Sequence, residues 1–131
     1  MVNVLALLSS RLYNIRMPKG DFLGEFELLT LAAVERLGDD AYGVTIRDEI
    51  EQRAQRRASI GAVYATLGRL ADKGYVAFWT SEPLPVRGGR ARKHARATAA
   101  GRRALRDSTR ALHRMLDGLE LGLTPRGGSP R

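Results

Sequence analysis

Cysteine is absent from the 131 residues of the chain, which excludes a disulfide framework and a thiolate site. A reducing compartment fits this composition, and we expect the protein in the cytoplasm. Long apolar runs are also missing, so no segment is expected to cross a membrane. Residues 2–8 resemble the core of a signal peptide. They lack a basic segment before them and a small-residue cleavage site after them, so we reject that interpretation.

Residues that carry out catalysis or bind metal ions are equally scarce. The two histidines, His94 and His113, have no cysteine and no carboxylate at a metal-binding spacing. A nucleophile–base pair and a glycine-rich phosphate-binding loop are also lacking. We therefore expect no enzymatic activity, no cofactor and no metal site.

Acidic residues are outnumbered by basic ones, 14 to 22, and the positive charge is unevenly placed. Residues 1–40 carry a net charge of −2 and residues 41–81 a net charge of +2, whereas residues 82–98 and 99–131 carry +4 each. This pattern indicates a polyanionic partner, with nucleic acid favoured over an anionic membrane surface. The length is sufficient for one domain with a core.

The stretch from Ser59 to Gly74 predicts the helix around which the chain is organised. Ser59 suits its start, Gly74 suits its end, and its apolar residues recur at helical spacing: Ile60, Val63, Tyr64, Leu67, Leu70 and Ala71. The opposite face consists of small residues and one arginine: Gly61, Ala62, Ala65, Thr66, Gly68 and Arg69. Such a face is either helix filler or a surface that lets the backbone approach a partner closely.

Two further helices are predicted before this one. Residues 21–37, with Asp21 as the expected cap, carry an apolar stripe of Phe26, Leu29, Thr30, Ala33, Val34 and Leu37. Residues 43–53 carry a narrower stripe of Val44, Ile46, Ile50 and Ala54. Residues 1–20 are predicted to be an N-terminal extension, helical or disordered, and we expect residues 1–16 to be dispensable.

A β-hairpin is predicted after the central helix. Residues 75–80 are rich in β-branched and aromatic side chains, and residues 92–98 form the expected returning strand. The loop between them, residues 82–90, contains two prolines and two glycines. Trp79 is interpreted as a packing residue of the first strand, with the wall of an aromatic-ligand pocket as the alternative.

The last predicted helix runs from residue 99 to about residue 121. Its apolar seam, weakened at Ser108, consists of Leu105, Leu112, Met115, Leu116 and Leu119. A helix of about 33 Å leaves too little of this small domain to pack against, so we expect it to pair with a second copy of the chain. Packing back onto its own domain is the alternative. Residues 122–131 are predicted to be a disordered tail.

This order of elements is that of a winged helix-turn-helix. The predicted fold is mainly α with a small β-hairpin wing over residues 21–98, followed by a C-terminal dimerisation helix. The major groove of B-DNA is about 12 Å wide and admits one helix, so the central helix is the expected reader and the hairpin the expected flanking contact. The predicted DNA-binding residues are Tyr42, Ser59, Ala62, Tyr64, Thr66 and Arg69 on the helices, and Arg87, Arg90, Arg92 and Lys93 on the hairpin. The ring of Tyr64 is assigned to the core, with its hydroxyl reaching toward phosphate.

The sequence also resembles the PadR family of bacterial transcriptional regulators over about residues 22–112. The similar motifs are Leu23-Gly24-Glu25-Phe26-Glu27, Tyr42-Gly43, Gly61-Ala62-Val63-Tyr64-Ala65-Thr66-Leu67, Arg69-Leu70, Lys73-Gly74, Arg87-Gly88-Gly89-Arg90 and Thr98-Ala99-Ala100-Gly101. The resemblance implies a winged-helix DNA-binding domain that dimerises through one C-terminal helix and usually acts as a repressor. Where the family commonly has an aromatic pair, this chain has His94 and Ala95, and Ala97 replaces a larger apolar residue. We therefore expect the hairpin to pack loosely.

Two functions are left open by the sequence. The first is a homodimeric, DNA-binding repressor that acts on a pseudo-palindromic operator in double-stranded DNA, with room for an unidentified small hydrophobic or aromatic effector. The second is a basic adaptor that docks an acidic protein through its last helix. The adaptor does not explain why a small-faced helix lies beside a basic hairpin.

Overall fold

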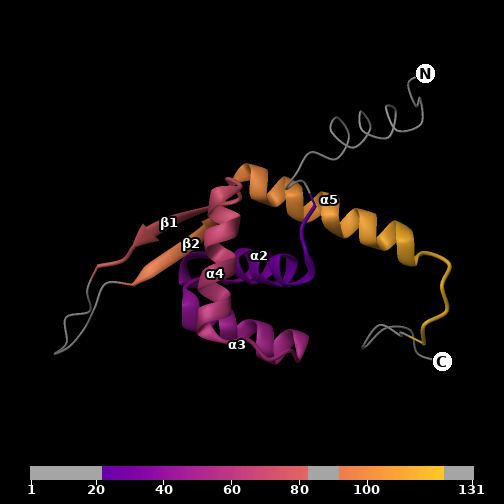
Figure 1. Cartoon of the computed structure of the whole chain (residues 1–131), viewed down its shortest axis with the longest axis horizontal. Coiled ribbons are helices and arrows are strands. Elements are labelled where there is room, and N and C mark those ends of the chain that lie inside the picture. Colours follow the sequence, from indigo (N-terminus) through magenta and orange to yellow (C-terminus); the bar gives the residue numbers. More distant parts are fainter. Residues whose placement is uncertain (1–21, 83–91, 123–131) are drawn as a thin grey trace, which may run out of the picture.

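A computed structural model describes residues 22–82 and 92–122 of the chain (Figure 1). The elements follow in the predicted order: α2 (Glu25–Leu37), a 3₁₀ turn η1 (Gly38–Asp40), α3 (Gly43–Ala54), α4 (Ile60–Asp72), β1 (Val76–Thr80), β2 (Lys93–Ala97) and α5 (Ala99–Leu116). Three predicted parts lie outside the described residues: the extension at residues 1–20, the loop arginines Arg87 and Arg90, and residues 123–131 of the tail.

Helix α2 begins at Glu25, so the predicted start at Asp21 is wrong. The reason is a local hydrogen bond, because the Gly24 N–H donates to the Glu27 carboxylate at 3.0 Å and closes the first turn there. The helix ends where Gly38 adopts a positive φ of 59°. Its buried residues include Leu31, which the predicted stripe omitted.

Helix α3 presents a narrower buried face than predicted. The Tyr42 N–H donates to the Thr45 hydroxyl at 3.0 Å at the start of the helix. Ile46 and Ile50 are buried, as expected, but Val44 is 45% exposed. Ala54 is exposed as well, so both outer members of the predicted stripe are wrong.

Helix α4 confirms the predicted central helix, but two of its side chains lie on the other face. The Ser59 hydroxyl caps the helix by accepting the Ala62 N–H at 3.0 Å. Val63, Leu67 and Leu70 are buried, as predicted. Thr66, predicted on the outer face, is buried at 1% exposure, whereas Tyr64, predicted in the core, is 41% exposed.

The two strands form an antiparallel hairpin, here called the wing, with Val76 opposite Ala97 and Thr80 opposite Lys93. The expectation that this hairpin packs loosely is wrong, because His94, Ala95 and Ala97 are all buried. The small methyl groups of Ala95 and Ala97 let the strand backbone lie close to its neighbours. The Ala95 N–H donates to the Ala41 carbonyl at 2.9 Å, and His94 forms a β-bridge with Tyr42.

The core lies where α2, α3 and α4 meet the wing. Its most completely buried large side chains come from all three helices: Leu31, Val34, Ile46, Val63, Leu67 and Leu70. In Figure 1, α4 crosses in front of α2, and the wing extends to one side of this bundle. Helix α4 is therefore held by the core along one face only.

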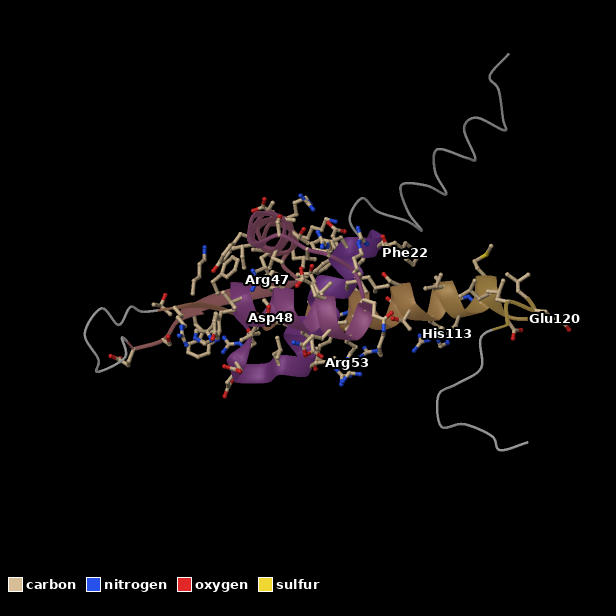
Figure 2. The ribbon with its side chains drawn as sticks, turned by 90° about the horizontal axis from the view of Figure 1, so that it is seen from below. Phe22, Arg47, Asp48, Arg53, His113 and Glu120 are labelled. Atoms are coloured by element: carbon tan, nitrogen blue, oxygen red, sulfur yellow. The ribbon has the colours of Figure 1, made fainter. Side chains whose placement is uncertain are left out.

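Helix α5 packs back on the domain mainly through small side chains. Its buried residues are Gly101, Ala104 and Ser108, and the Ser108 hydroxyl accepts the Leu23 N–H at 3.1 Å. The helix ends at Leu116, so the predicted end near residue 121 is wrong and Leu119 lies beyond the helix. The second half of α5 projects away from the bundle, where Figure 2 labels His113 and Glu120. Among the described residues, no helix is both long and apolar enough to span a membrane.

Candidate nucleic-acid interface

The outer face of α4 is a surface of small side chains. Gly61, Ala62 and Ala65 are exposed, and Gly68 is half-buried. A Cβ placed on Gly68 would meet no atom within 4 Å, so the space beside this face is open. The helix backbone at this face lies close to any surface that approaches it, as major-groove binding requires.

Tyr64 lies between α4 and the first turn of α3. A Cβ on Gly43 would lie 2.6 Å from the Tyr64 hydroxyl and 2.7 Å from two carbons of its ring. Only glycine at position 43 leaves room for this ring. The side chain of Tyr64 is thus fixed over the N-terminal turn of α3 and still presents part of its surface to solvent.

Tyr42, His94 and Trp79 form an aromatic cluster at the base of the wing. The rings of His94 and Trp79 stack with their centres 4.1 Å apart, and the ring of Tyr42 meets His94 edge-on at 5.3 Å. Trp79 is therefore a packing residue, as predicted. From the sequence, His94 was expected to weaken the packing of the hairpin. Its ring instead joins the wing to the start of α3.

Two cations of the wing are positioned by aromatic rings. The Arg92 guanidinium lies 4.7 Å from the centre of the Tyr42 ring, and the Lys93 ammonium lies 4.1 Å from that of Phe78. Both residues are exposed. A cation over an aromatic face keeps its charge available while its side chain loses freedom. Arg92 and Lys93 therefore present exposed positive charge on opposite faces of the hairpin, each held against an aromatic ring, and their part in DNA binding stays a prediction.

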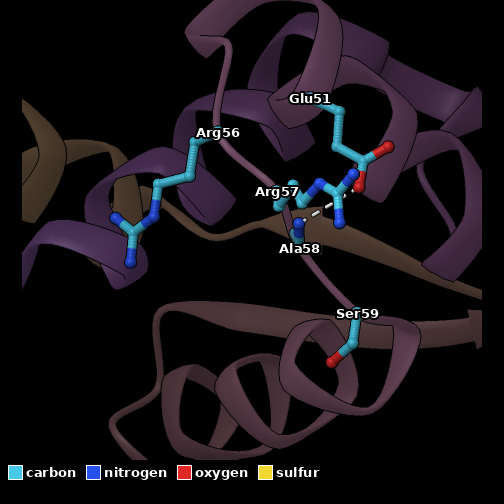
Figure 3. A pocket seen from close by; sticks show the side chains of 5 residues that line it. All are labelled: Glu51, Arg56, Arg57, Ala58 and Ser59. Atoms are coloured by element: carbon cyan, nitrogen blue, oxygen red, sulfur yellow. Dashed lines mark hydrogen bonds between the residues drawn. The ribbon is translucent and has the colours of Figure 1, made fainter.

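A second group of cations lies at the N-terminal end of α4. Arg56, Arg57, Ala58 and Ser59 line an open groove of about 610 Å³ together with Glu51 (Figure 3). The Ala58 N–H donates to the Glu51 carboxylate at 3.1 Å, which fixes the connecting segment. In Figure 3 the two arginines extend in opposite directions from this segment.

Arg56 and Arg57 also line an adjoining groove of about 460 Å³ that runs along α4 past Ala62 and Ala65. Arg56 packs over the Phe26 ring at 5.2 Å and pairs with Glu25. Neither arginine is among the DNA-binding residues predicted from the sequence. Their position directly before a helix N-terminus, which favours anions, is the signal that could have identified them.

Glu27, in the first turn of α2, connects that helix to the end of α4. Lys73 donates to both oxygens of its carboxylate, at 2.9 and 3.1 Å, and the Arg69 Nε lies 3.7 Å away. Burial raises the pKa of Glu27, but the Lys73 hydrogen bond, the Gly24 N–H and the charges of Lys73 and Arg69 together lower the pKa below its ordinary value. Glu27 is therefore ionised wherever the protein is folded at neutral pH.

The structure brings four of the predicted DNA-binding residues to the groove along α4: Ser59, Ala62, Thr66 and Arg69. Ser59, Ala62 and Arg69 lie along α4, with Tyr42 and Arg92 at the base of the wing. Thr66 contributes little surface to this groove, because it is buried and its hydroxyl accepts a hydrogen bond from Arg69 at 3.0 Å. Within residues 22–82 and 92–122, no three histidine or acidic residues come together as a metal site.

Comparison with known protein families shows to which family the chain belongs. Residues 31–107 match the transcriptional regulator PadR-like family. The chain belongs to the PadR-like family. This match confirms the resemblance noted from the sequence motifs. PadR regulators bind DNA and commonly dimerise, so the chain is a DNA-binding transcription regulator by family.

Solved PadR structures share the winged-helix fold. A PadR family transcription regulator from hypervirulent Clostridium difficile R20291 is 23% identical, with a TM-score of 0.59 over 72% of this chain and 96% of its own. A PadR family regulator from Eggerthella lenta DSM 2243 is 22% identical, with a TM-score of 0.58 over 88% of this chain and 90% of its own. At these identities the likeness establishes the fold. Comparison with curated proteins gave no significant match.

Proposed function

We propose that this PadR protein is a repressor that binds a pseudo-palindromic operator as a homodimer, with α4 in the major groove. The observation that supports the proposal is the open small-residue face of α4, which has a group of cations at its N-terminal end. Arg56 and Arg57 line the groove there, and Arg92 and Lys93 add exposed positive charge on the wing. A helix with thin side chains and cations beside it matches a groove bounded by phosphate backbones.

The second half of α5 supports the proposed dimer. Leu112 is 46% exposed, Met115 76% and Leu116 38%, and Leu119 beyond the helix end is 57% exposed. These side chains lie at the projecting end of α5, whereas Leu105 is half-buried against the domain. An apolar patch of this kind on a polar helix is typical of a surface covered by a second subunit. We propose that α5 of a second copy covers it.

Selection of duplexes from a random pool, followed by binding measurements at several salt concentrations, tests the proposal. We expect selected sites with two half-sites whose centres are about 10 bp, or a multiple, apart. Replacing both Arg92 and Lys93 by alanine is expected to lower the slope of log K against log salt by about 1.8, since each phosphate contact contributes about 0.9. Arg103→Ala, an exposed cation on α5, is the control and is expected to leave the slope unchanged.

A wild-type protein that binds no duplex at low salt would contradict the proposed DNA binding. Selected sites without half-site symmetry, together with a single-chain mass in solution, would contradict the homodimer. Equal salt slopes for the wing variant and for Arg103→Ala would remove the wing from the interface.

A further inference from the structure

Glu27 is an acidic residue beside the proposed DNA surface, where negative charge opposes binding. Its side chain is only 12% exposed. Its carboxylate accepts hydrogen bonds from the Gly24 N–H and from Lys73, so both oxygens are occupied. A largely buried carboxylate with several donors keeps a fixed position.

Two cations, Arg69 of α4 and Lys73 at its C-terminal cap, converge on this carboxylate. Lys73 binds it at 2.9 Å, and Arg69 approaches it to 3.7 Å. Arg69 is held a second time, because its guanidinium donates to the buried Thr66 hydroxyl at 3.0 Å. Both cations are therefore directed toward α2 and are partly neutralised by one acidic group.

Paired cations contribute less to the sequence-independent attraction of DNA than free cations do. That attraction comes from cations that neutralise phosphates and release counterions. A cation that already has a carboxylate partner releases fewer, and the carboxylate itself repels phosphate. The pairing therefore weakens the attraction on which binding to a random duplex rests, whereas binding to an operator also rests on base contacts.

We infer that Glu27 is a specificity-determining positioning residue, which holds Lys73 and Arg69 against α2 and so weakens binding to random DNA relative to the operator. The inference rests on the proposed function, since it concerns the same surface. It adds a role for an acidic residue that touches no DNA. Removing the carboxylate is expected to free two cations for phosphate.

Glu35 provides a matched control on the same helix. It also pairs with an arginine, Arg102 of α5, with the Nε 3.1 Å from its carboxylate. Glu35 is more exposed than Glu27, and its partner lies on α5 rather than on α4. Glu35→Gln and Glu27→Gln therefore change the net charge equally, and only Glu27→Gln releases cations of α4.

The test measures binding of the full chain to a random-sequence duplex and to a selected operator over a range of salt concentrations. For Glu27→Gln we expect the random-duplex slope of log K against log salt to steepen by up to about 1.8. Random-duplex affinity is expected to rise roughly tenfold at low salt, and the ratio of operator to random affinity is expected to fall. Glu35→Gln is expected to leave the slope and the ratio unchanged.

Lys73→Gln tests the same inference without removing Glu27. Because Lys73 is already paired, its loss is expected to leave the random-duplex slope unchanged, whereas in the Glu27→Gln background the same change is expected to reduce the slope by about 0.9. A slope that falls by about 0.9 in Lys73→Gln alone overturns the inference. Identical slopes for Glu27→Gln and Glu35→Gln also overturn it. A wild-type protein that binds no DNA instead refutes the proposed function, so the two failures are distinguishable.

Discussion

Two glycine-to-alanine substitutions are expected to have opposite effects on stability. At Gly101, in the first turn of α5, a Cβ would lie 2.1 Å from the Tyr75 carbonyl oxygen and 2.9 Å from its carbonyl carbon. Both distances are below the 3.0 Å that Cβ atoms keep from other heavy atoms. The obstacle is backbone, and the same carbonyl accepts the Thr98 N–H at 3.0 Å. Helix α5 would therefore have to move away from the strand.

The magnitude follows from three contributions. Overpacking against a rigid neighbour costs about 1–3 kcal/mol. Weakening of the Thr98 hydrogen bond adds about 1 kcal/mol, and the higher helix propensity of alanine offsets about 1 kcal/mol. Gly101→Ala is thus expected to destabilise the protein by roughly 2 kcal/mol. At Gly68 nothing lies within 4 Å of the added Cβ, so Gly68→Ala is expected to stabilise by up to about 1 kcal/mol.

Thermal and urea unfolding at fixed protein concentration measure this difference. At roughly 4 °C per kcal/mol, Gly101→Ala is expected to lower Tm by about 8 °C and Gly68→Ala to raise it by about 4 °C. Fixed concentration matters because association stabilises the folded state. Equal Tm shifts for the two variants would refute the close packing of α5 on the Tyr75 backbone.

Three further predictions concern the site. Ser59→Ala removes the cap of α4 and is expected to lower the free energy of unfolding in urea by about 1 kcal/mol, whereas Ser59→Asp is expected to retain most of that stability. Equal stabilities of Ser59→Ala and the wild type would contradict the cap. Gly43→Ala is expected to destabilise the wild type by at least about 1 kcal/mol more than it destabilises a Tyr64→Ala background, and additive effects would show that the ring does not cover Gly43. Because the pKa of Glu27 lies below its ordinary value of 4.5, its stabilising effect is complete above that pH and is lost as pH falls through the lower folded value. As the pH falls from 5 through this lowered pKa, Glu27→Gln is therefore expected to lose less stability than the wild type, and parallel curves of stability against pH would exclude this contribution.

The parts of the fold that depend on local signals were predictable from the sequence. Helix α4 was predicted because Ser59 caps it and because its apolar residues recur at helical spacing. The burial of Thr66 and the exposure of Tyr64 were not predictable, because they depend on the surroundings of each side chain in the folded protein. The Tyr64 ring fits over Gly43 of α3, and the Thr66 hydroxyl finds a donor in Arg69.

The end of α5 at Leu116 could have been predicted from a local signal. Gly118 follows the helix with a φ of 84°, and a glycine just past a helix is a common stop signal. The heptad spacing of the leucines outweighed this signal in the prediction. The buried face of α5 could not be read in the same way, since Gly101, Ala104 and Ser108 are small, and Gly101 is required by the close approach of the Tyr75 backbone rather than by hydrophobicity.

The wing shows how an apparent mismatch can be accommodated. His94 and Ala95 were expected to weaken the hairpin, because they offer less apolar surface than aromatic residues. In the folded protein the His94 ring stacks on Trp79, and Ala95 brings its backbone within hydrogen-bonding distance of Ala41. Neither contact follows from the pattern of one strand alone.

The central claim is that the small-residue face of α4 lies against DNA, and a carboxylate placed on it tests this most directly. Ala65 is exposed in the middle of this face, and Gln52 is exposed on α3 outside the proposed surface. In binding measurements on a selected operator, Ala65→Glu is expected to lose about 100-fold or more in affinity, since a like charge against phosphate costs several kcal/mol. Gln52→Glu, with the same change in charge, is expected to lose less than about threefold. Equal losses for the two variants would contradict the placement of α4 on DNA.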